Sequence, residues 1–532
     1  MALVLEELGD ANGFHRRDLD ITHRPPEVNR TVSAVPPASP TAAPGGGAGT
    51  PGEAPFERRL GLLLLGGVLV LGAAFRLYRA LHDDGIYWPD EVYQSLEPAH
   101  RLVYGYGLVA WEFVQGARNW ALPALVAGVL GLGRWVGLTD PAGYLAWVKG
   151  FFALVGTATA WATWRLARAS GASTLAASGG AALFALASVP LYFAPRAMSE
   201  NASVLPVVLG LALALPKAAS RRALITGASL LGLAVLLRLQ NGVFCVGLVA
   251  VLLCRRQWRQ AGVALAVLSG WALAFGLLDR LTWGRWFHSA IVYLDFNVVQ
   301  GKAAQWGTEP FEYYPRVLRT AMPVLTVLTA ALAVLAVPRA WGLSLLAAAF
   351  FLLHAVQPHK ELRFLVPVLP LFAALAGVGL DSCMRVLRGT PARATATLAV
   401  VAGALLSGAG AGALTFGDVG QYERVRPRDS AWDDQGHVNR LLEAAGRRDD
   451  VCGLKVEAVH LAWTGGYSYF HRKVPLYPHN GPGRDSRRFS HVITRAGFEG
   501  AGTLLIQDGP LALVKLPVAD CAPDPGYSWR LP

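Results

Sequence analysis

The sequence predicts a mainly α-helical protein, a bundle of membrane-spanning helices with a small α/β segment at its C-terminal end. Of its 532 residues, 53% are hydrophobic and 16% are charged, whereas soluble proteins carry about 25% charged residues. Apolar runs of about 20 residues, the length that crosses a bilayer as a helix, recur between Leu60 and Phe416. These observations define a tail (1–59), a membrane domain (60–415) and a C-terminal domain (416–532).

The tail is polar and ends in a stretch rich in Pro, Gly and Ala. It holds too few apolar residues to form a core, so we expect it to be disordered. The apolar runs after it predict eleven spans, several of them short enough to be tilted or broken. The predicted spans are 60–79, 143–166, 173–193, 201–216, 223–239, 242–254, 261–279, 320–337, 341–357, 364–380 and 395–415.

Basic residues gather in every second connection between these spans. Arg58 and Arg59 precede the first span. Further basic residues lie at 165–168, 217–222, 255–259, 339 and 385–393. Because cytoplasmic loops carry an excess of Lys and Arg, we expect the N-terminus to be cytoplasmic; Arg76 and Arg79 are exceptions. This distribution also accounts for the net charge of +12 without any binding of nucleic acid.

On this count several polar segments share the outer, or periplasmic, side. They are the loops 80–142 and 280–319, the short loop around His359, and the C-terminal domain. We therefore expect one catalytic cavity facing away from the cytoplasm. The stretch 283–314 is dense in aromatic residues, which we expect to form an interfacial belt rather than a platform for sugar stacking.

The first candidate site follows Pro89 in the loop 80–142. Proline suits the first position of a helix, so Asp90 and Glu91 fall in the first turn, where the helix dipole keeps them ionised. An ionised carboxylate at the membrane surface is able to take a proton from a sugar hydroxyl. The alternative is that these acids only cap a helix beside the membrane.

The spacing of the polar residues after Asp90 predicts that this site continues along one face of a helix. Gln94, Glu97 and Arg101 recur at intervals of three or four residues after Asp90, and side chains at these intervals are neighbours on a helix. We expect the four side chains to line the same surface.

The second candidate site is the charged loop between two late spans, with His359, Lys360, Glu361 and Arg363. Cations on the outer side run against the general trend, and a phosphate would compensate for them, because Arg offers a bidentate fork and Lys a point charge. Arg238, near the outer end of its span, is a further cation for this phosphate. The alternative is that these long side chains snorkel to the membrane surface.

The C-terminal domain contains two cysteines, Cys452 and Cys521. They are able to form a disulfide in an oxidising compartment, and no spacing predicts a zinc site. The run 463–472 predicts a strand and turn of a small α/β or β cap. We expect His471 to serve packing rather than catalysis.

The two charged motifs together resemble those of the Alg9-like and GPI-type mannosyltransferases, a branch of the multi-spanning GT-C glycosyltransferases. That family shows Pro-Asp-Glu followed by Gln-Ser-Leu-Glu in its first outer loop, as in 89–91 and 94–97 here. It also shows His-Lys-Glu-x-Arg-Phe between two late spans, as in 359–364. The resemblance covers residues 60–380, and Arg118 and Glu200 within this range also fit it. Trp88 departs from it, because a histidine often precedes Pro-Asp-Glu. The composition, rich in Pro, Gly, Ala and Arg, is typical of a bacterial member.

This resemblance implies a GT-C fold and an inverting transfer of a sugar, usually mannose, from a polyprenyl-phosphate donor to a hydroxyl of a lipid-linked or glycan acceptor in the membrane. It implies no cofactor and no required metal, although the acidic pair is able to hold one. Asp90 is then the general base, and Glu91 shares this role or positions the acceptor. Residues expected to bind the donor phosphate are His359, Lys360, Arg363 and Arg238. Residues expected to position the acceptor or the sugar are Gln94, Glu97, Arg118 and Glu200.

A transporter is the alternative from another functional class. It would use Asp90 and Glu91 with His359 and Lys360 as a relay for protons or substrate. Transporters often contain two repeated halves with matching broken spans, and the sequence shows no such repeat. The acids also lie in a long outer loop rather than within a span, so the sequence favours the glycosyltransferase.

Overall fold

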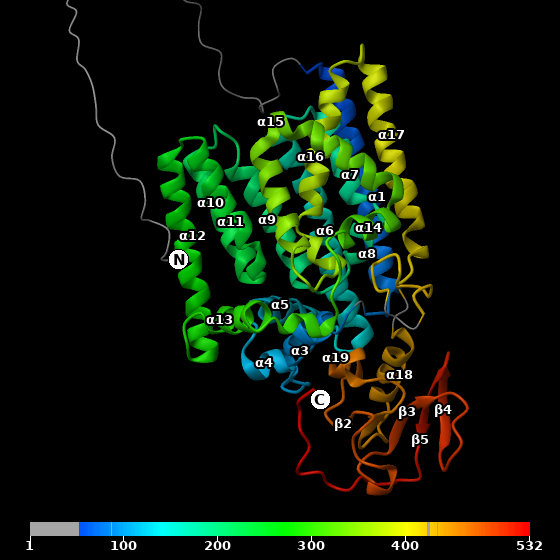
Figure 1. Cartoon of the computed structure of the whole chain (residues 1–532). Coiled ribbons are helices and arrows are strands. Elements are labelled where there is room, and N and C mark those ends of the chain that lie inside the picture. The colour runs from blue at the N-terminus through cyan, green and yellow to red at the C-terminus, as the bar shows by residue number, and fades with distance from the viewer. Residues whose placement is uncertain (1–52, 87, 423–425, 433–434, 532) are drawn as a thin grey trace, which may run out of the picture. The chain divides into compact units, whose positions relative to one another are not determined.

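A computed structural model describes residues 53–531 of the chain, except 87, 423–425 and 433–434. Residues 1–52 of the predicted tail therefore lie outside the described residues. The described part consists of a bundle of long helices, an outer layer of short helices, and a C-terminal domain with a β-sheet (Figure 1).

The predicted spans fall on helices, but the predicted span 173–193 is wrong as a single helix, because it is divided into the two short helices α7 and α8. The helices of the bundle are α1 (Pro55–His82), α6 (Pro141–Ala169), α7 (Thr174–Ala185), α8 (Ser188–Phe193), α9 (Ser199–Ala214), α10 (Arg221–Leu237), α11 (Gly242–Cys254), α12 (Trp258–Trp283), α15 (Pro323–Ala355), α16 (Leu369–Met384) and α17 (Thr390–Ala409). The predicted spans 320–337 and 341–357 are the two halves of α15, which is kinked at Ala340 just after Pro338. One apolar helix was not predicted, α5 (Ala121–Trp135) within the outer loop.

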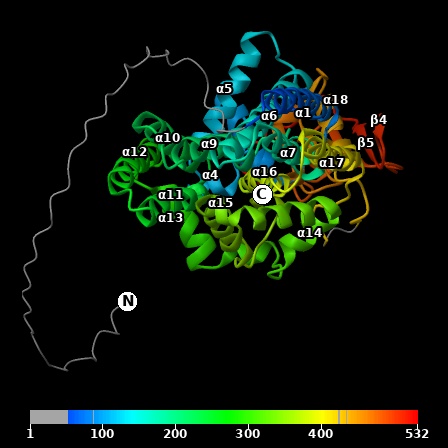
Figure 2. The ribbon, with the colours of Figure 1, turned by 90° about the horizontal axis from the view of Figure 1, so that it is seen from above.

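Length and composition allow five helices of the described part to cross a membrane by themselves: α1, α6, α12, α15, and α17 with the 3₁₀ turn that follows it. Helix α16 packs between α15 and α7, and α1 packs against α6 and α7. Figure 2 shows α10, α11 and α12 at one end of the bundle and α17 toward the other. Small residues permit these close contacts: a Cβ atom added to Gly180 of α7 would lie 2.7 Å from the carbonyl oxygen of Ala373 in α16.

The two arginines that depart from the charge pattern are held by the protein. Arg76 is fully buried, and its guanidinium donates to the carbonyl oxygens of Phe184 at 3.0 Å and Ala185 at 2.5 Å. The guanidinium of Arg79 lies over the ring of Trp432, 4.6 Å from its centre. Both guanidinium groups therefore have partners within the protein.

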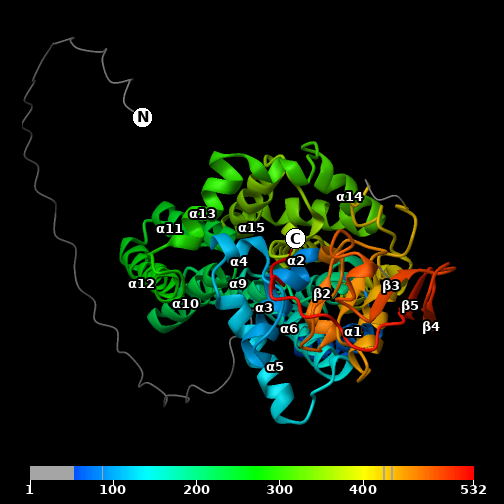
Figure 3. The same ribbon diagram turned by 90° about the horizontal axis from the view of Figure 1, so that it is seen from below.

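Short helices form a layer at one end of the bundle. They are α2 (Pro89–Glu91), the π-helical turn η1 (Val92–Leu96), α3 (Glu97–Tyr104), α4 (Trp111–Gln115) and α13 (His288–Leu294). A further short helix, α14 (Tyr313–Ala321), packs against α15 and α8 of the bundle. Figure 3 shows α2, α3 and α4 next to the end of the described chain. There the amide of Val109 donates to the carbonyl of Trp529, and the amide of Leu531 donates to the carbonyl of Val109.

The C-terminal domain is a five-stranded mixed sheet with two helices, which confirms the predicted α/β segment. The strands are β1 (Leu454–Val456), β2 (Leu476–Tyr477), β3 (His491–Arg495), β4 (Thr503–Asp508) and β5 (Leu511–Lys515), in the order β2-β1-β3-β5-β4. The helices are α18 (Gly436–Gly446) and α19 (Gly466–Phe470). A disulfide joins Cys452 to Cys521, as the sequence suggests.

The run 463–472 contains the short helix α19 and no strand, so the predicted strand there is wrong. Gly466 has a φ of +53°, a conformation that glycine adopts without strain. It opens α19 so that the amides of Tyr467 and Ser468 point toward α3. His471 at the end of this helix lies 2.9 Å from His100, Nδ1 to Nε2, and packs among tyrosine rings, which agrees with a packing role.

Candidate active site

Asp90 and Glu91 are neighbours in sequence but have different surroundings. Trp88 is extended and Pro89 begins α2, so the two acids occupy the first turn, as the sequence predicts. The side chain of Asp90 is 22% exposed and lines a cavity, whereas that of Glu91 is 4% exposed and does not line it. Of the two acids, only Asp90 therefore lines the cavity.

Glu91 belongs to a buried ion-pair cluster. Its Oε2 lies 3.1 Å from Nη1 of Arg196, a fully buried arginine whose Nη2 lies 3.3 Å from Oδ2 of Asp83. The ammonium group of Lys149 donates to the backbone carbonyl of Asp83. This cluster ties α2 to the turn before α9 and leaves Glu91 without access to the cavity.

Arg363 joins the two charged motifs. Its Nη2 donates to Oδ2 of Asp90 at 2.7 Å, and its Nε and Nη2 donate to Glu361 at 2.8 and 2.9 Å. Burial opposes the charge of Glu361, but Arg363 and His359 outweigh it and hold the pKa of Glu361 at about 2. Burial also opposes the charge of Arg363, and its carboxylate neighbours keep its pKa well above the usual value.

His359 lies beside this pair and completes the loop. Its Nε2 is 3.1 Å from Oε1 of Glu361, and its Nδ1 is 3.1 Å from the carbonyl of Gly307. Burial disfavours the imidazolium, but the hydrogen bond to Glu361 outweighs this effect and raises the pKa of His359. The loop therefore places an imidazole of increased basicity at the cavity wall.

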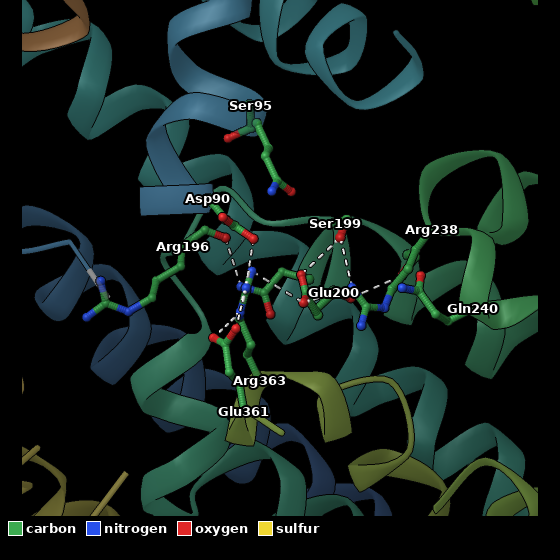
Figure 4. Close-up of polar contacts among 12 residues, drawn as sticks. Asp90, Ser95, Arg196, Ser199, Glu200, Arg238, Gln240, Glu361 and Arg363 are labelled. Carbon is green, nitrogen blue, oxygen red and sulfur yellow. Dashed lines mark hydrogen bonds and ion pairs between the residues drawn. The ribbon is translucent and has the colours of Figure 1, made fainter. Parts of the chain in front are cut away.

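Glu200 lies between two arginines from distant segments of the chain, Arg238 just after α10 and Arg363 in the loop between α15 and α16 (Figure 4). Its Oε1 is 2.8 Å from Nη1 of Arg238 and 3.7 Å from Nη1 of Arg363. Arg238 also donates to Oγ of Ser199 at 3.1 Å. The sequence predicts Arg238 and Arg363 as one cation group, and the structure brings them together through this shared carboxylate.

Lys360 points away from the cavity that holds Asp90. Its ammonium donates to the backbone carbonyls of Glu309 at 2.6 Å and Gln357 at 2.5 Å. It lines a smaller hollow of about 230 Å³ beside the main one. The four residues predicted to bind phosphate thus divide into three at the main cavity and Lys360 outside it.

The main cavity measures about 400 Å³, within the range of small-molecule sites. One end is charged, with Asp90, Glu200, Arg238, Glu361 and Arg363. The rest contains aromatic and polar side chains, and the C-terminal domain contributes a wall through His460, Ala462, Trp463 and Leu531.

Three aromatic residues from the stretch 283–314 also line the cavity: Tyr293, Phe296 and Trp306. The prediction of an interfacial belt is therefore wrong for these three. Phe296 and Trp306 pack against Trp111 of α4, with ring centres 4.7 and 6.1 Å away.

A further carboxyl in the cavity, Glu112, is absent from the predicted site. Nε2 of Gln94 donates to its Oε1 at 2.8 Å. Burial and, to a lesser extent, the charge of Asp90 raise the pKa of Glu112 to about 7. Arg118 lines the same wall, with its guanidinium over the ring of Tyr293. In the sequence, Glu112 is indicated by the pair Trp111-Glu112, which lies in the same outer loop as Asp90.

Glu97 does not line the cavity, contrary to the predicted polar face. Its carboxylate is fully buried and accepts hydrogen bonds from the amides of Leu108, Tyr467 and Ser468 and from Oγ of Ser468, at 2.7 to 3.1 Å. The π-helical turn η1 between Asp90 and Glu97 changes the helical register. Glu97 therefore faces α19 of the C-terminal domain, and burial raises its pKa.

Comparison with known proteins identifies the family. The profile of the Alg9-like mannosyltransferase family matches residues 68–423. The chain belongs to this family. The match begins within α1, includes both charged motifs, and ends at residue 423, before α18 and the sheet of the C-terminal domain, so Trp463 and His460 lie outside it.

Among relatives of this Alg9-like chain, GPI mannosyltransferase 3 of Yarrowia lipolytica is 32% identical over 330 residues, which cover 60% of this chain and 63% of the relative. GPI alpha-1,2-mannosyltransferase 3 of Xenopus laevis is 25% identical over 357 residues, 60% of each chain. The chain thus spans less than two thirds of the length of these relatives.

The fold is that of the GT-C glycosyltransferases. ArnT from Cupriavidus metallidurans, solved with undecaprenyl phosphate, is similar with a TM-score of 0.57 over 87% of this chain and 99% of its own, at 13% identity. The oligosaccharyltransferase of Archaeoglobus fulgidus has a TM-score of 0.51 over 83% and 69% of the two chains, also at 13% identity. Together with the apolar helices, the family shows that this Alg9-like chain is an integral membrane protein.

Proposed function

We propose that this protein is an inverting mannosyltransferase that moves mannose from a polyprenyl-phosphate donor to a hydroxyl of a lipid-linked or glycan acceptor. The relatives bear mannosyltransferase names, and none of the comparisons supports the transporter alternative. The single observation that carries the proposal is the 2.7 Å contact between Asp90 and Arg363, which puts a carboxylate beside a cation group in one cavity.

In this proposal Asp90 is the base. Its carboxylate takes the proton of the acceptor hydroxyl while the acceptor oxygen forms a bond to the anomeric carbon of mannose. The bond from this carbon to the phosphate oxygen breaks, and its electron pair leaves with the polyprenyl phosphate. Attack opposite the leaving group inverts the anomeric centre. Glu91, held by Arg196 away from the cavity, positions α2 and does not share the proton transfer.

Arg363, Arg238 and His359 are the groups that stabilise the departing phosphate. Their cationic side chains converge on the carboxylates of Glu200 and Glu361, so a bound phosphate would find them already oriented. Lys360, held by two backbone carbonyls, acts in this scheme by shaping the loop. Among the described residues, no group of three or more His, Cys, Asp or Glu side chains is arranged to hold a metal ion, and the proposed steps use only the protein's cations.

A separate apolar groove of about 820 Å³ suits the polyprenyl chain. It is lined by α15 and α16, the two helices joined by the loop of Arg363, together with α7 and α14. The solved ArnT holds undecaprenyl phosphate, a lipid of this class. We place the cavity on the outer face, because the charges of the connecting loops favour that orientation.

The test uses the full chain in nanodiscs with a synthetic polyprenyl-phosphate [³H]mannose and membrane glycolipid extract as acceptor. The wild type should produce radiolabelled glycolipid, and Asp90→Asn should reduce the rate at least about 100-fold, since general-base catalysis contributes factors of this size. A matched control is Asp449→Asn, because Asp449 is fully exposed in the C-terminal domain. Full activity of Asp90→Asn would remove Asp90 as the base, and no transfer by the wild type from any polyprenyl-phosphate sugar would refute the function.

A further inference from the structure

Two tryptophans from distant parts of the chain meet at the cavity. Trp88 directly precedes Pro89 of α2, and Trp463 belongs to the C-terminal domain. Their ring centres are 5.0 Å apart, with the ring planes at 83°. Both line the main cavity and also the neighbouring hollow of about 230 Å³. The two rings therefore form a corner where the two hollows adjoin.

We propose that Trp88 and Trp463 form an acceptor subsite that holds a sugar ring of a glycan, and that the C-terminal domain thereby selects the acceptor. This inference rests on the proposed function, because it names the acceptor of the same reaction. A pyranose presents an apolar face of C–H groups, and a large aromatic ring is a rigid surface on which such a face packs.

The position of the corner relative to the base supports this assignment. Trp88 lies two residues before Asp90, and both side chains line the main cavity. A sugar packed against Trp88 would therefore present its hydroxyls near the carboxylate that is proposed to deprotonate one of them. The donor phosphate site, formed by Arg238 and Arg363, lies at the charged end of the same cavity.

The arrangement of the hollows favours a glycan over a lipid chain at this corner. The apolar groove shares no lining residue with the main cavity or with the smaller hollow, within the described part of the chain. A hydrocarbon chain therefore has its own separate groove. The smaller hollow instead contains Glu309, Lys360 and Glu361, polar groups suited to hydroxyls. A second sugar of the same glycan would extend from the corner into it.

The corner is fixed by hydrogen bonds between the two parts that build it. Oη of Tyr93 in η1 donates to the carbonyl of Leu461 at 2.8 Å, two residues before Trp463. The carboxylate of Glu97 binds the start of α19, a few residues after Trp463. The loop with Trp463 is thus held on both sides to the acidic helix, which makes it a preformed wall rather than a passing contact.

Binding and transfer are tested with one sugar probe, octyl α-D-mannopyranoside, on the full chain in nanodiscs, with 1-octanol as the comparison ligand. Saturation-transfer NMR and titration calorimetry should detect the mannoside with the wild type and not 1-octanol. In Trp463→Ala the Kd and the KM for the mannoside should rise about tenfold, which corresponds to about 1.4 kcal/mol. Trp463→Phe should retain most of the binding. The control Trp135→Ala, at an 83% exposed position outside both hollows, should change neither constant.

The outcomes separate the two proposals. An unchanged mannoside Kd in Trp463→Ala, or equal binding of 1-octanol and the mannoside, would overturn the subsite. If the mannoside binds and Trp463→Ala weakens it while the wild type transfers no mannose, the subsite stands and the proposed function fails. Size-exclusion profiles and thermal unfolding identify a variant that does not fold, and Trp463→Phe and Trp88→Phe then supply the comparison.

Discussion

Arg363 Nη2 lies 2.7 Å from Asp90 Oδ2, although 273 residues separate the two in sequence. This pair connects α2 to the loop between α15 and α16 and links the proposed base to the proposed phosphate site. Arg363 also donates to Glu361 and lies 3.7 Å from Glu200, so its planar guanidinium hydrogen-bonds two carboxylates and forms a longer ion pair with a third. Any change in this side chain should therefore affect both halves of the reaction.

Arg363→Lys tests this double role. A lysine keeps the charge, but it is a point charge and cannot reproduce the fork that serves Asp90 and Glu361 together. We expect kcat to fall at least about tenfold, a loss of about 1.4 kcal/mol in transition-state stabilisation, with a rise in KM for the donor. Steady-state kinetics with polyprenyl-phosphate mannose measures both constants. Arg316→Lys, at a half-exposed ion pair with Glu309, is the control; wild-type kinetics in Arg363→Lys would contradict the role.

Glu91→Gln should destabilise the protein rather than abolish its chemistry. The variant leaves the buried guanidinium of Arg196 with one fewer charged partner, and breaking a buried ion pair costs about 3–5 kcal/mol. The melting temperature in detergent should fall, while correctly folded protein keeps measurable transfer. Asp90→Asn should show the reverse, with a nearly unchanged melting temperature and no transfer. Loss of activity without loss of stability in Glu91→Gln would instead assign the proton transfer to Glu91.

Glu97→Gln should loosen the C-terminal domain. The amide keeps one acceptor oxygen where the carboxylate has two, and hydrogen bonds to charged groups contribute about 1.5–3 kcal/mol. We expect faster limited proteolysis between α17 and α18 and a higher KM for the acceptor. Glu499→Gln, at an exposed position of the same domain, is the control. Equal proteolysis of Glu97→Gln and the wild type would show that this carboxylate does not hold the domain.

Glu112 predicts a pH dependence of stability. Burial raises its pKa from 4.5 to about 7 in the folded protein. The folded state therefore retains this proton more strongly than the unfolded chain, and the associated stability is present below pH 4.5 and is lost as the pH rises to 7. The melting temperature of the wild type should fall relative to that of Glu112→Gln between pH 5 and pH 8. Parallel pH profiles of the two proteins would contradict this.

The sequence was sufficient to predict most of the bundle, because long apolar runs have few alternatives to membrane-spanning helices. It missed α5, whose apolar residues lie within a loop otherwise marked by polar motifs. Two local predictions agree with the structure: Asp90 lies in the first turn of α2, and His359 and Arg363 meet at Glu361 in the loop between α15 and α16.

The predictions that are wrong concern the positions of side chains, which depend on how the folded segments pack together. Glu97 was misplaced because the π-helical turn η1 breaks the spacing on which the prediction relied. Lys360 was grouped with its neighbours by sequence, but its ammonium turns to backbone carbonyls on the other side of the loop. The cavity wall formed by Trp463 depends on contacts across hundreds of residues, which no local pattern encodes.

The disulfide between Cys452 and Cys521 also provides a natural reporter of membrane topology. Its formation requires an oxidising compartment, whereas Cys245, Cys254 and Cys383 are free and lie in the bundle. Because the domain that carries the disulfide also supplies Trp463 to the cavity, the redox state of this one cystine in intact cells indicates which side of the membrane the cavity faces. Alkylation with a membrane-impermeant maleimide, before and after reduction, would assign the side without any amino-acid substitution.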